Sequence, residues 1–211
     1  MLEVKHFVES DMERINALIR NNPLGIVIVH TDLGLDAHHL PMLSVDSASG
    51  SQLQAHIPRN NALSNLASAK QDCLVIFQGA DGYISPSWYA TKKEHGKVVP
   101  TWNYLVVHMK GKLTIVDDSD WVLNQINGLT ELQEQQHEAP WAVDDAPQKY
   151  VSAQLKALVG VQIDVTDIQA KSKASQNQPK QNQASVLDAL ARRPESAGLY
   201  DEMQKIIGST S

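Results

Sequence analysis

Several kinds of residue are scarce in this sequence, and each shortage excludes a class of protein. Only one of the 211 residues, Cys73, is a cysteine, which excludes a disulfide framework within the chain and any site built from a CxxC pair. No apolar run approaches the roughly 18 residues that a membrane helix needs, and no basic start followed by an apolar stretch opens the sequence. We therefore expect no secretory signal. We predict a cytoplasmic protein without a membrane span, in which Cys73 is a small buried hydrophobe.

The familiar phosphate-binding and hydrolase motifs are also missing. Neither GxGxxG nor GxxxxGK[ST] occurs, so no phosphate loop supports dinucleotide or nucleoside triphosphate binding. HExxH and GxSxG are absent as well. His38 and His39 are adjacent, and adjacent side chains on a strand point to opposite faces. This pair therefore cannot chelate one ion, and we predict no metal site.

Basic residues are fewer than acidic residues. The formal net charge is −6, whereas a protein with a broad nucleic-acid-binding face usually has a basic balance. The short basic clusters KSK and ARR are too small to form a convincing DNA footprint, and we find no helix-turn-helix pattern. With 42% hydrophobic residues, the chain can bury a core of the size expected for one generous domain.

Short strands dominate the predicted secondary structure. Three β-rich runs with short links predict an antiparallel meander, and a later region with a KGK centre predicts a long hairpin that turns near Lys110–Lys112. Many short strands with hairpin-length links are typical of a closed or nearly closed β-barrel. The predicted strands cover residues 24–32, 34–46, 52–57, 73–79, 98–118 and 161–168.

Helices are expected at a few places along the chain. Ser10 followed by Glu13 is a capping-box pattern for a helix over residues 11–20, and Asn60 or Asn61 can cap a short helix before residue 70. A third helix is expected to begin at Asp118 or Ser119, and a fourth before Gly160. The polar, Gln-rich stretch 169–185 has the composition of a linker. Two short helices are expected over residues 186–193 and 199–207.

Aromatic residues are rare, yet they are concentrated in one segment. Tyr83–His108 holds five of the eleven aromatic residues, mixed with Ser, Thr, Asn, Lys and His. A plain core strand does not require this mixture, whereas a site for a flat ring with a polar edge does. Trp88 and Trp102 could instead fill the interior of the barrel, and the sequence leaves that alternative open.

An anion site is indicated upstream of this segment. In AHIPRNN a strand is followed by Arg59 and then by a capped helix start. Free backbone N–H groups at a helix N-terminus and the planar fork of an arginine both suit a phosphate. The simpler alternative is a surface arginine at an ordinary helix start. Together with the aromatic segment, the pattern favours a phosphorylated aromatic cofactor.

Several longer motifs resemble those of the PaiB-type family of FMN-binding proteins. The similarity extends from VKHFVESD to SQNQP and so covers nearly the whole chain. It implies an FMN-binding split β-barrel that works as a homodimer, with each FMN at the subunit interface. Members are described as negative transcriptional regulators, in Bacillus linked to protease synthesis and sporulation. The motifs that carry the resemblance are HHLP, AHIPRNN, YISPSWYATKKEHGKVVPTWNYLVVHMKG, APWAVDDAP and SQNQP.

The same resemblance suggests which residues hold the flavin. The FMN phosphate would be held after one strand and at a helix start, a second strand would run along the ring and ribityl chain, and the partner subunit would supply the aromatic segment. The sequence departs from the family where a histidine at 38 or 39 replaces a common Thr and where Asn61 replaces a Pro. The predicted cofactor residues are His38, His39, Leu40, His56, Arg59, Asn60, Ser87, Trp88, Tyr89, Lys92, Thr101, Trp102, Asn103 and Gln176.

Fold and function are therefore predicted as follows. We expect a mainly β fold with helices (α+β), a split β-barrel with peripheral helices, whose FMN-binding domain covers residues 1–170. Residues 171–211 would form a polar segment and C-terminal helices near the barrel. A regulator is the function that the resemblance implies, and direct binding to DNA is possible although the charge does not support it. A flavin-dependent oxidoreductase, with His39, Tyr89 or Lys92 near the ring, and a storage protein without turnover are the alternatives.

Overall fold

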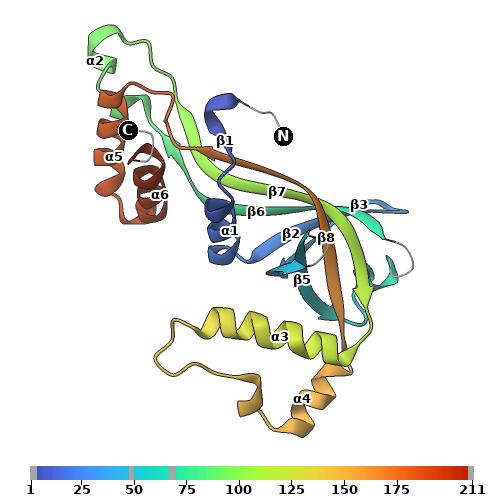
Figure 1. Cartoon of the computed structure of the whole chain (residues 1–211). Coiled ribbons are helices and arrows are strands. Elements are labelled where there is room, and N and C mark those ends of the chain that lie inside the picture. Colours follow the sequence, from blue (N-terminus) through green and yellow to red (C-terminus); the bar gives the residue numbers. More distant parts are fainter. Residues whose placement is uncertain (1–3, 48–49, 67–69, 209–211) are drawn as a thin grey trace. The chain divides into compact units, whose positions relative to one another are not determined.

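A computed structural model describes residues 4–47, 50–66 and 70–208 (Figure 1). The chain forms two compact units, and three long strands have residues in both. Unit 1 contains residues 1–18, 78–107 and 169–211, and unit 2 contains residues 19–77 and 108–168. The shared strands are β6 (Gln71–Ile84), β7 (Thr101–Val116) and β8 (Leu158–Lys173).

Unit 2 is built on an antiparallel sheet. Its strands follow the order β3-β2-β6-β7-β8-β5-β4. Every second residue of β2 and β5 is buried, which is the period-2 pattern of strands with one face on a core. β3 also contacts β5, so the sheet curves back on itself as a barrel does. The strands not yet given are β2 (Leu24–Thr31), β3 (Gly34–Pro41), β4 (Leu43–Ser47) and β5 (Gly50–Pro58).

The predicted meander has the right antiparallel pairs, but its middle strand is wrong. The run over residues 34–46 is divided at Met42, which is buried between β3 and β4. β3 pairs with β2, whereas β4 pairs with β5, and the two strands lie at opposite ends of the strand order. The second partner of β5 is the distant β8. Hairpin-length links therefore predicted the right hairpin pairs, but they did not predict the break at Met42 or the pairing with β8.

The predicted hairpin near residues 110–112 is also wrong, because β7 runs without a break through Gly111. A Cβ atom at this position would lie 2.6 Å from Ile163 Cγ2 and 2.7 Å from the backbone oxygen of Asp164. A real Cβ atom does not make contacts that short, so Gly111 allows β8 to approach β7 closely. The glycine serves strand packing here and makes no turn.

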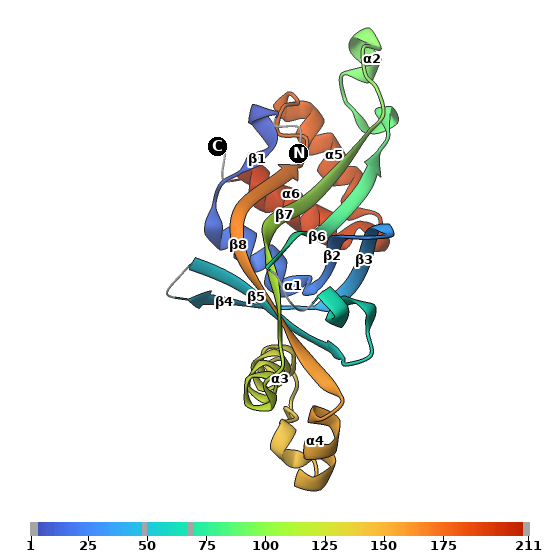
Figure 2. The same cartoon turned by 90° about the vertical axis from the view of Figure 1, so that its right-hand side faces the viewer.

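The helices of unit 2 begin close to the predicted positions. Asp118 Oδ1 accepts hydrogen bonds from the N–H groups of Asp120 and Trp121, which confirms this residue as the N-cap of α3 (Ser119–Glu134). α3 contacts β4, β5 and α4 (Gln148–Leu155), its neighbour in Figure 2. Gly160 lies inside β8 and not in the turn after a helix.

The short helix after β5 is a 3-10 turn, η2 (Ala62–Leu66). Asn61 Oδ1 accepts a hydrogen bond from the N–H of Leu63 at 2.9 Å, so Asn61 is its cap, as one of the two predicted choices. The remainder of that predicted helix, residues 67–69, lies outside the described residues.

Cys73 is buried in β6, as predicted. Its Sγ donates a weak hydrogen bond to the backbone oxygen of Gly111 at 3.5 Å. Burial, together with the charge of Asp72, raises the pKa of the thiol to about 12. At neutral pH the group is therefore a thiol and not a reactive thiolate.

Unit 1 contains the N-terminal residues and the C-terminal helices. α1 (Met12–Asn21) begins in this unit, and its cap is Asp11, whose Oδ1 accepts a hydrogen bond from the N–H of Glu13 at 2.9 Å. The predicted cap, Ser10, lies one residue too early. The other elements that begin in this unit are η1 (Lys5–Phe7), β1 (Val8–Glu9), η3 (Pro86–Trp88), α2 (Lys92–His95), α5 (Lys180–Ala191), η5 (Pro194–Ser196) and α6 (Ala197–Gly208).

The stretch over residues 169–185 is ordered structure and not a linker. β8 continues to Lys173, Ala174 and Ser175 are buried, and α5 already begins at Lys180. The amide of Gln176 accepts a hydrogen bond from the N–H of Ala174 and donates one to the oxygen of Ser172. The polar composition suggested a linker, but in the folded chain these polar side chains form hydrogen bonds within the segment. The predicted domain boundary at residue 170 falls inside β8.

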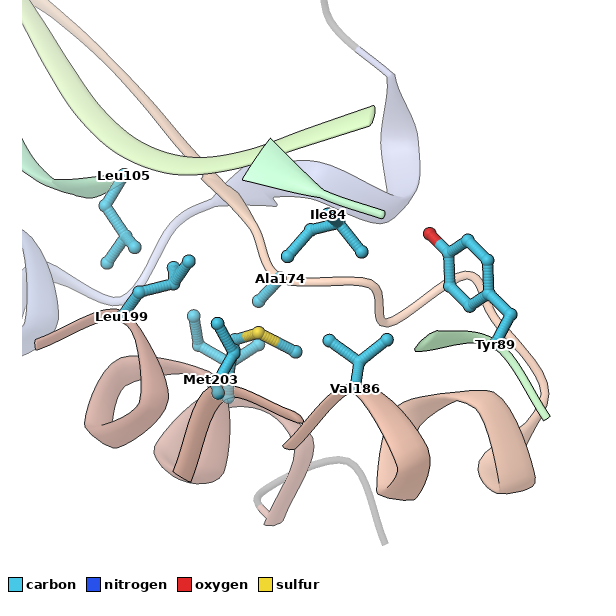
Figure 3. Packing of buried hydrophobic residues seen from close by; sticks show 9 residues of the cluster. Ile84, Tyr89, Leu105, Ala174, Val186, Leu199 and Met203 are labelled. Atoms are coloured by element: carbon cyan, nitrogen blue, oxygen red, sulfur yellow. The ribbon is translucent and has the colours of Figure 1, made fainter. Parts of the chain in front are cut away.

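A hydrophobic cluster holds α5 and α6 to the strands of unit 1 (Figure 3). Val186 and Leu190 of α5 and Leu199, Met203 and Ile206 of α6 supply one side. The other side comes from β6, β7 and the chain after β8. Figure 3 shows these side chains converging, with Tyr89 at the rim. The strand and loop members are Ile84, Tyr89, Leu105 and Ala174.

In the described part of the chain, no helix is long and apolar enough to cross a membrane.

Candidate functional site

Arg59 lies directly after β5, where the anion site was predicted. Its guanidinium donates two hydrogen bonds to the Asp117 carboxylate, each 2.7 Å long. These bonds raise the pKa of Arg59 and lower the pKa of Asp117. The Arg59 guanidinium also donates hydrogen bonds to the backbone oxygens of Lys156 and Leu158. Both ionised groups are exposed to water, so the pair contributes little stability and can exchange Asp117 for another anion.

His56 and Asn60 flank Arg59. His56 Nδ1 lies 2.7 Å from Oε1 of Gln125, which is buried and donates in turn to the oxygen of Gln54. This bond fixes the orientation of the imidazole, while Asn60 is exposed. The three residues predicted to hold a phosphate therefore lie together at one end of β5.

The two histidines of β3 point to opposite faces, as predicted. His39 is exposed, whereas His38 is largely buried, with Nε2 3.1 Å from Asp36 Oδ2. That approach lacks the geometry of a hydrogen bond, so Nε2 of His38 is buried without one. Leu40 is buried in the core. Within the described residues no group of three or more His, Cys, Asp or Glu side chains could hold a metal ion.

The aromatic residues of the central segment have different environments in unit 1. Tyr83 and Trp102 form an edge-to-face pair with ring centroids 6.2 Å apart, and they are 48% and 54% exposed. Trp88 is partly buried beneath the guanidinium of Arg193, 4.8 Å from its ring centroid. Tyr89 is buried, and burial raises the pKa of its hydroxyl. Trp102 therefore does not fill the barrel, and its ring is available to a ligand or a partner.

Ser87 and Lys92 form a small polar pair beside these aromatics. The Nζ of Lys92 donates to Ser87 Oγ at 3.0 Å. Ser85 caps η3 by accepting a hydrogen bond from the N–H of Ser87, and Pro86 fixes the first residue of the turn. A surface depression lies against this turn, lined by Ser87, Trp88, Tyr89, Ala90, Lys92 and Lys93.

Thr101 and Asn103 lie on β7 and line a cavity within unit 1. Thr101 Oγ1 accepts a hydrogen bond from Lys173 Nζ. Asn103 is fully buried, and its Nδ2 donates to Ser175 Oγ at 2.9 Å and to Met203 Sδ at 3.3 Å. Gln176, the remaining predicted residue, is engaged in the local bonds that fold the chain after β8.

The predicted cofactor residues thus form two groups, one in each unit. In unit 2, His38, His39 and Leu40 lie on β3, and His56, Arg59 and Asn60 lie at the end of β5, which contacts β3. The predicted residues of unit 1 lie on η3, α2, β7 and the chain after β8. Sequence reasoning missed the cavity residues Thr91, Lys173, Ser175 and Asn182. Residues 169–173 contain a single apolar side chain, Ala170, so the sequence carries no alternation that would have marked them as a strand.

Replacing Trp102 by alanine separates binding from packing. Because the side chain is more than half exposed, we expect the free energy of unfolding to change by no more than about 0.5–1 kcal/mol. A buried neighbour on the same strand, Leu105→Ala, is expected to cost about 2–5 kcal/mol. Urea unfolding of both variants measures the difference. If Trp102→Ala lowers the free energy of unfolding as much as Leu105→Ala does, Trp102 is a core residue and not an exposed binding residue.

Comparison with known proteins identifies the family. The model of the family described as "Putative FMN-binding domain" matches residues 1–167. The chain belongs to this FMN-binding family. Its cofactor is accordingly FMN, as the resemblance implied.

Two relatives extend the match. The protein named Protease synthase and sporulation protein PAI 2, from Bacillus subtilis, is 32% identical over 186 residues, covering 88% of this chain and 87% of that protein. An uncharacterized protein of Saccharomyces cerevisiae is 41% identical over 106 residues. That match covers 49% of this chain and 63% of the yeast protein, which is less than two thirds of its length.

A solved structure confirms the fold. The FAD and heme binding protein from Mycobacterium smegmatis superposes with a TM-score of 0.59 at 16% sequence identity, covering 79% of this chain and 73% of that one. At this identity the similarity concerns the fold alone. The mainly antiparallel sheet with peripheral helices is therefore a split barrel, as predicted.

The chemistry of the side chains fits FMN. A flavin phosphate needs cationic and N–H donors, and Arg59 presents an exposed fork whose present partner is itself exposed. A flavin ring needs an aromatic face and polar groups at its edge, and unit 1 has an exposed aromatic ring in Trp102 and polar side chains in Ser87 and Lys92. The imidazole of His38, whose Nε2 lies 3.1 Å from Asp36 Oδ2, is a further polar group on β3, the predicted flavin strand.

Proposed function

We propose that the protein is a homodimeric FMN-binding regulator of the PaiB type, with FMN at the subunit interface. The match over 88% of the chain to a Bacillus subtilis protein named for protease synthesis and sporulation carries this proposal. In the proposed dimer, His56, Arg59 and Asn60 hold the phosphate, and β3 with His38, His39 and Leu40 follows the ring and ribityl chain. The partner contributes Ser87, Trp88, Tyr89, Lys92, Thr101, Trp102 and Asn103. FMN supplies electron-transfer chemistry when bound.

Exposed apolar side chains at the β2–β3 turn support the dimer. Leu33 is fully exposed in this turn, and Leu35, near the start of the edge strand β3, is also exposed. β3 is the last strand of its sheet, and an exposed apolar edge strand invites pairing unless something covers it. A second copy of this chain would cover it. We therefore propose that residues of this edge lie in the interface.

The net charge favours a regulator that acts through a protein partner or through its flavin. Acidic proteins are repelled by DNA phosphates, and with a net charge of −6 a broad DNA-binding face is not supported. Titration with its own upstream DNA at low salt tests direct repression. Saturable, salt-sensitive binding would make DNA the partner, and its absence would direct the search to proteins.

The absorption spectrum of the purified protein, taken before and after adding FMN and desalting, tests the cofactor. We expect a retained, shifted flavin band at about one FMN per chain and, by light scattering, the mass of two chains. A colourless protein after FMN addition would contradict the cofactor site. Bound FMN on a monomer would contradict the interface while leaving the cofactor intact.

Reduction of the bound flavin distinguishes the regulator from an oxidoreductase. Rapid bleaching of the flavin band by NADH or NADPH, with turnover on an added acceptor, would favour an enzyme. His39 and Lys92, which are exposed titratable side chains, are the residues to replace in that case. Absence of bleaching supports a regulatory role.

A further inference from the structure

A cavity of about 460 Å³ lies entirely within unit 1. Its walls are β7, the loop before β7, the end of β8 and the chain that leads into α5. The volume lies within the range of pockets that hold small molecules, about 300–1,000 Å³.

The lining of this cavity is positive. Lys97 and Lys173 contribute to it, and among the described residues no aspartate or glutamate does. Apart from His95, the rest of the lining consists of neutral amide and hydroxyl groups and of apolar side chains, among them Phe7, Val98 and Val99. A cavity with cations, neutral hydrogen-bonding groups and an apolar wall selects an anion that carries an apolar part.

Lys173 is the cation to which the cavity is adapted. Its Nζ donates to Thr101 Oγ1 and lies 5.9 Å above the centroid of the Phe7 ring. In the described chain no carboxylate forms an ion pair with it. Burial and the charge of Lys171 lower its pKa. A partly buried ammonium group without a counter-charge is unfavourable, and a bound anion removes that cost.

Asn103 indicates that the ligand also carries a hydrogen-bond donor. The residue is fully buried at the cavity wall, and its Nδ2 is engaged by Ser175 and Met203. Its Oδ1 is buried without a hydrogen-bond partner. Native proteins rarely leave such an atom unsatisfied, and an N–H or O–H group of a ligand would satisfy it.

The opposite wall is held rigidly. Asn182 accepts a hydrogen bond from the N–H of Thr91 and donates one to its hydroxyl. Ser175 has a φ of 60°, in the left-handed region that a non-glycine residue rarely adopts. Backbone strain of this kind is found where a binding site needs a fixed side chain. The Ser175 hydroxyl is the one that orients Asn103.

We propose that this cavity is a second ligand site, for a small organic anion that combines a carboxylate, an adjacent N–H or O–H donor and an apolar group. Lys173 meets the carboxylate, Asn103 accepts from the donor, and Phe7 with Val98 contacts the apolar group. Such an anion is the substrate or effector of the protein. Because Tyr89, Thr101 and Asn103 are also among the flavin contacts proposed above, the inference rests on the proposed function in this respect, and the site is tested in the FMN-saturated protein.

Calorimetric titration of the full-length, FMN-saturated protein with hippurate tests the site. Hippurate carries a carboxylate, a neighbouring amide N–H and an aromatic ring. We expect one binding event per chain, an affinity at least about tenfold lower for hippurate methyl ester, which lacks the charge, and no binding of benzylamine. In a nitrogen–proton NMR spectrum the side-chain amide of Asn103 should shift when hippurate binds.

Two lysine variants locate the site. Lys173→Gln is expected to reduce hippurate affinity by at least about tenfold, whereas Lys112→Gln, which removes an exposed lysine paired with Asp72 in unit 2, should leave it unchanged. If Lys173→Gln does not fold, as judged by circular dichroism, Lys97→Gln is measured instead and should also reduce the affinity.

Each of the opposite results overturns the proposal. These are the absence of hippurate binding, equal binding of the methyl ester, and full affinity in the lysine variants. Displacement of hippurate from the FMN-free protein by added FMN would show that the cavity belongs to the flavin site. The second-ligand proposal would then fail, although FMN binding itself would be established.

Discussion

Arg59→Ala is expected to weaken FMN binding by about 10- to 100-fold. The substitution removes a charge-assisted bidentate contact to phosphate, worth roughly 1.5–3 kcal/mol, and about 1.4 kcal/mol corresponds to tenfold in affinity. In the structure the guanidinium is engaged by Asp117, so the phosphate has to replace that carboxylate. Replacing the Asp117 carboxylate by a phosphate costs little free energy, because Arg59 and Asp117 are both exposed to water. Quenching of flavin fluorescence during titration measures the affinity.

Asp117→Asn is the matched control for this result. It retains the shape of the side chain but removes the charge that competes for Arg59, so FMN affinity should be unchanged or higher. If Arg59→Ala binds FMN as well as the unaltered protein, Arg59 is not the phosphate ligand. Its role is then the ion pair with Asp117 and the contacts to the chain at residues 156–158.

Phe77→Ala is expected to lower the free energy of unfolding by about 3–5 kcal/mol. The ring is fully buried in unit 2, and it lies directly over Gly25, where a Cβ would be only 2.9 Å from its Cε1 atom. A cavity left by the ring could not collapse easily, because Gly25 has no side chain to move into it. Urea unfolding followed by circular dichroism provides the measurement.

Tyr150→Ala is the control for Phe77→Ala, since it removes an exposed ring from α4. We expect its effect to stay within about 0.5 kcal/mol. Equal losses for the two variants, or a small loss for Phe77→Ala, would mean that the packing around Gly25 rearranges to fill the space.

Local signals in the sequence predicted local structure well. The alternation in β2 and β5, the cap at Asp118 and the cap at Asn61 all describe interactions within a few residues. The fold class followed from the number of strands and from the family resemblance. In each case the physical cause lies within one element or one motif, so the sequence displays it.

Predictions that depended on distant partners failed. Gly111 was interpreted as a turn residue. The position requires glycine because Ile163 and Asp164 approach it closely, and these residues are too distant in the sequence for that contact to be predicted. The hairpin partners of β3 and β4 were right, but their separation to opposite ends of the sheet was missed, because the pairing of β5 with β8 is settled by long-range packing. The segment after β8 was interpreted as a linker because its amides find partners only once it is folded.

The same distinction applies to the candidate site. The sequence identified the aromatic segment, but only the structure separates the exposed Trp102 from the buried Tyr89. It identified Arg59, but Asp117, which engages its guanidinium, lies 58 residues away. Lys173 was missed because nothing near it in the sequence marks a cation beside Asn103.

The pairing of β5 with β8 has a consequence for biosynthesis. β5 finds one neighbour, β4, immediately before it, but the Gln52 amide of β5 and the Asp164 carboxylate of β8 that bond across the second edge lie 112 residues apart. At about 5–20 residues per second, a ribosome needs on the order of ten seconds to supply the missing strand. During that interval the nascent chain carries an open strand edge with alternating apolar residues, which is a substrate for chaperones and for aggregation. The yield of folded protein should therefore depend on the speed of translation between these strands.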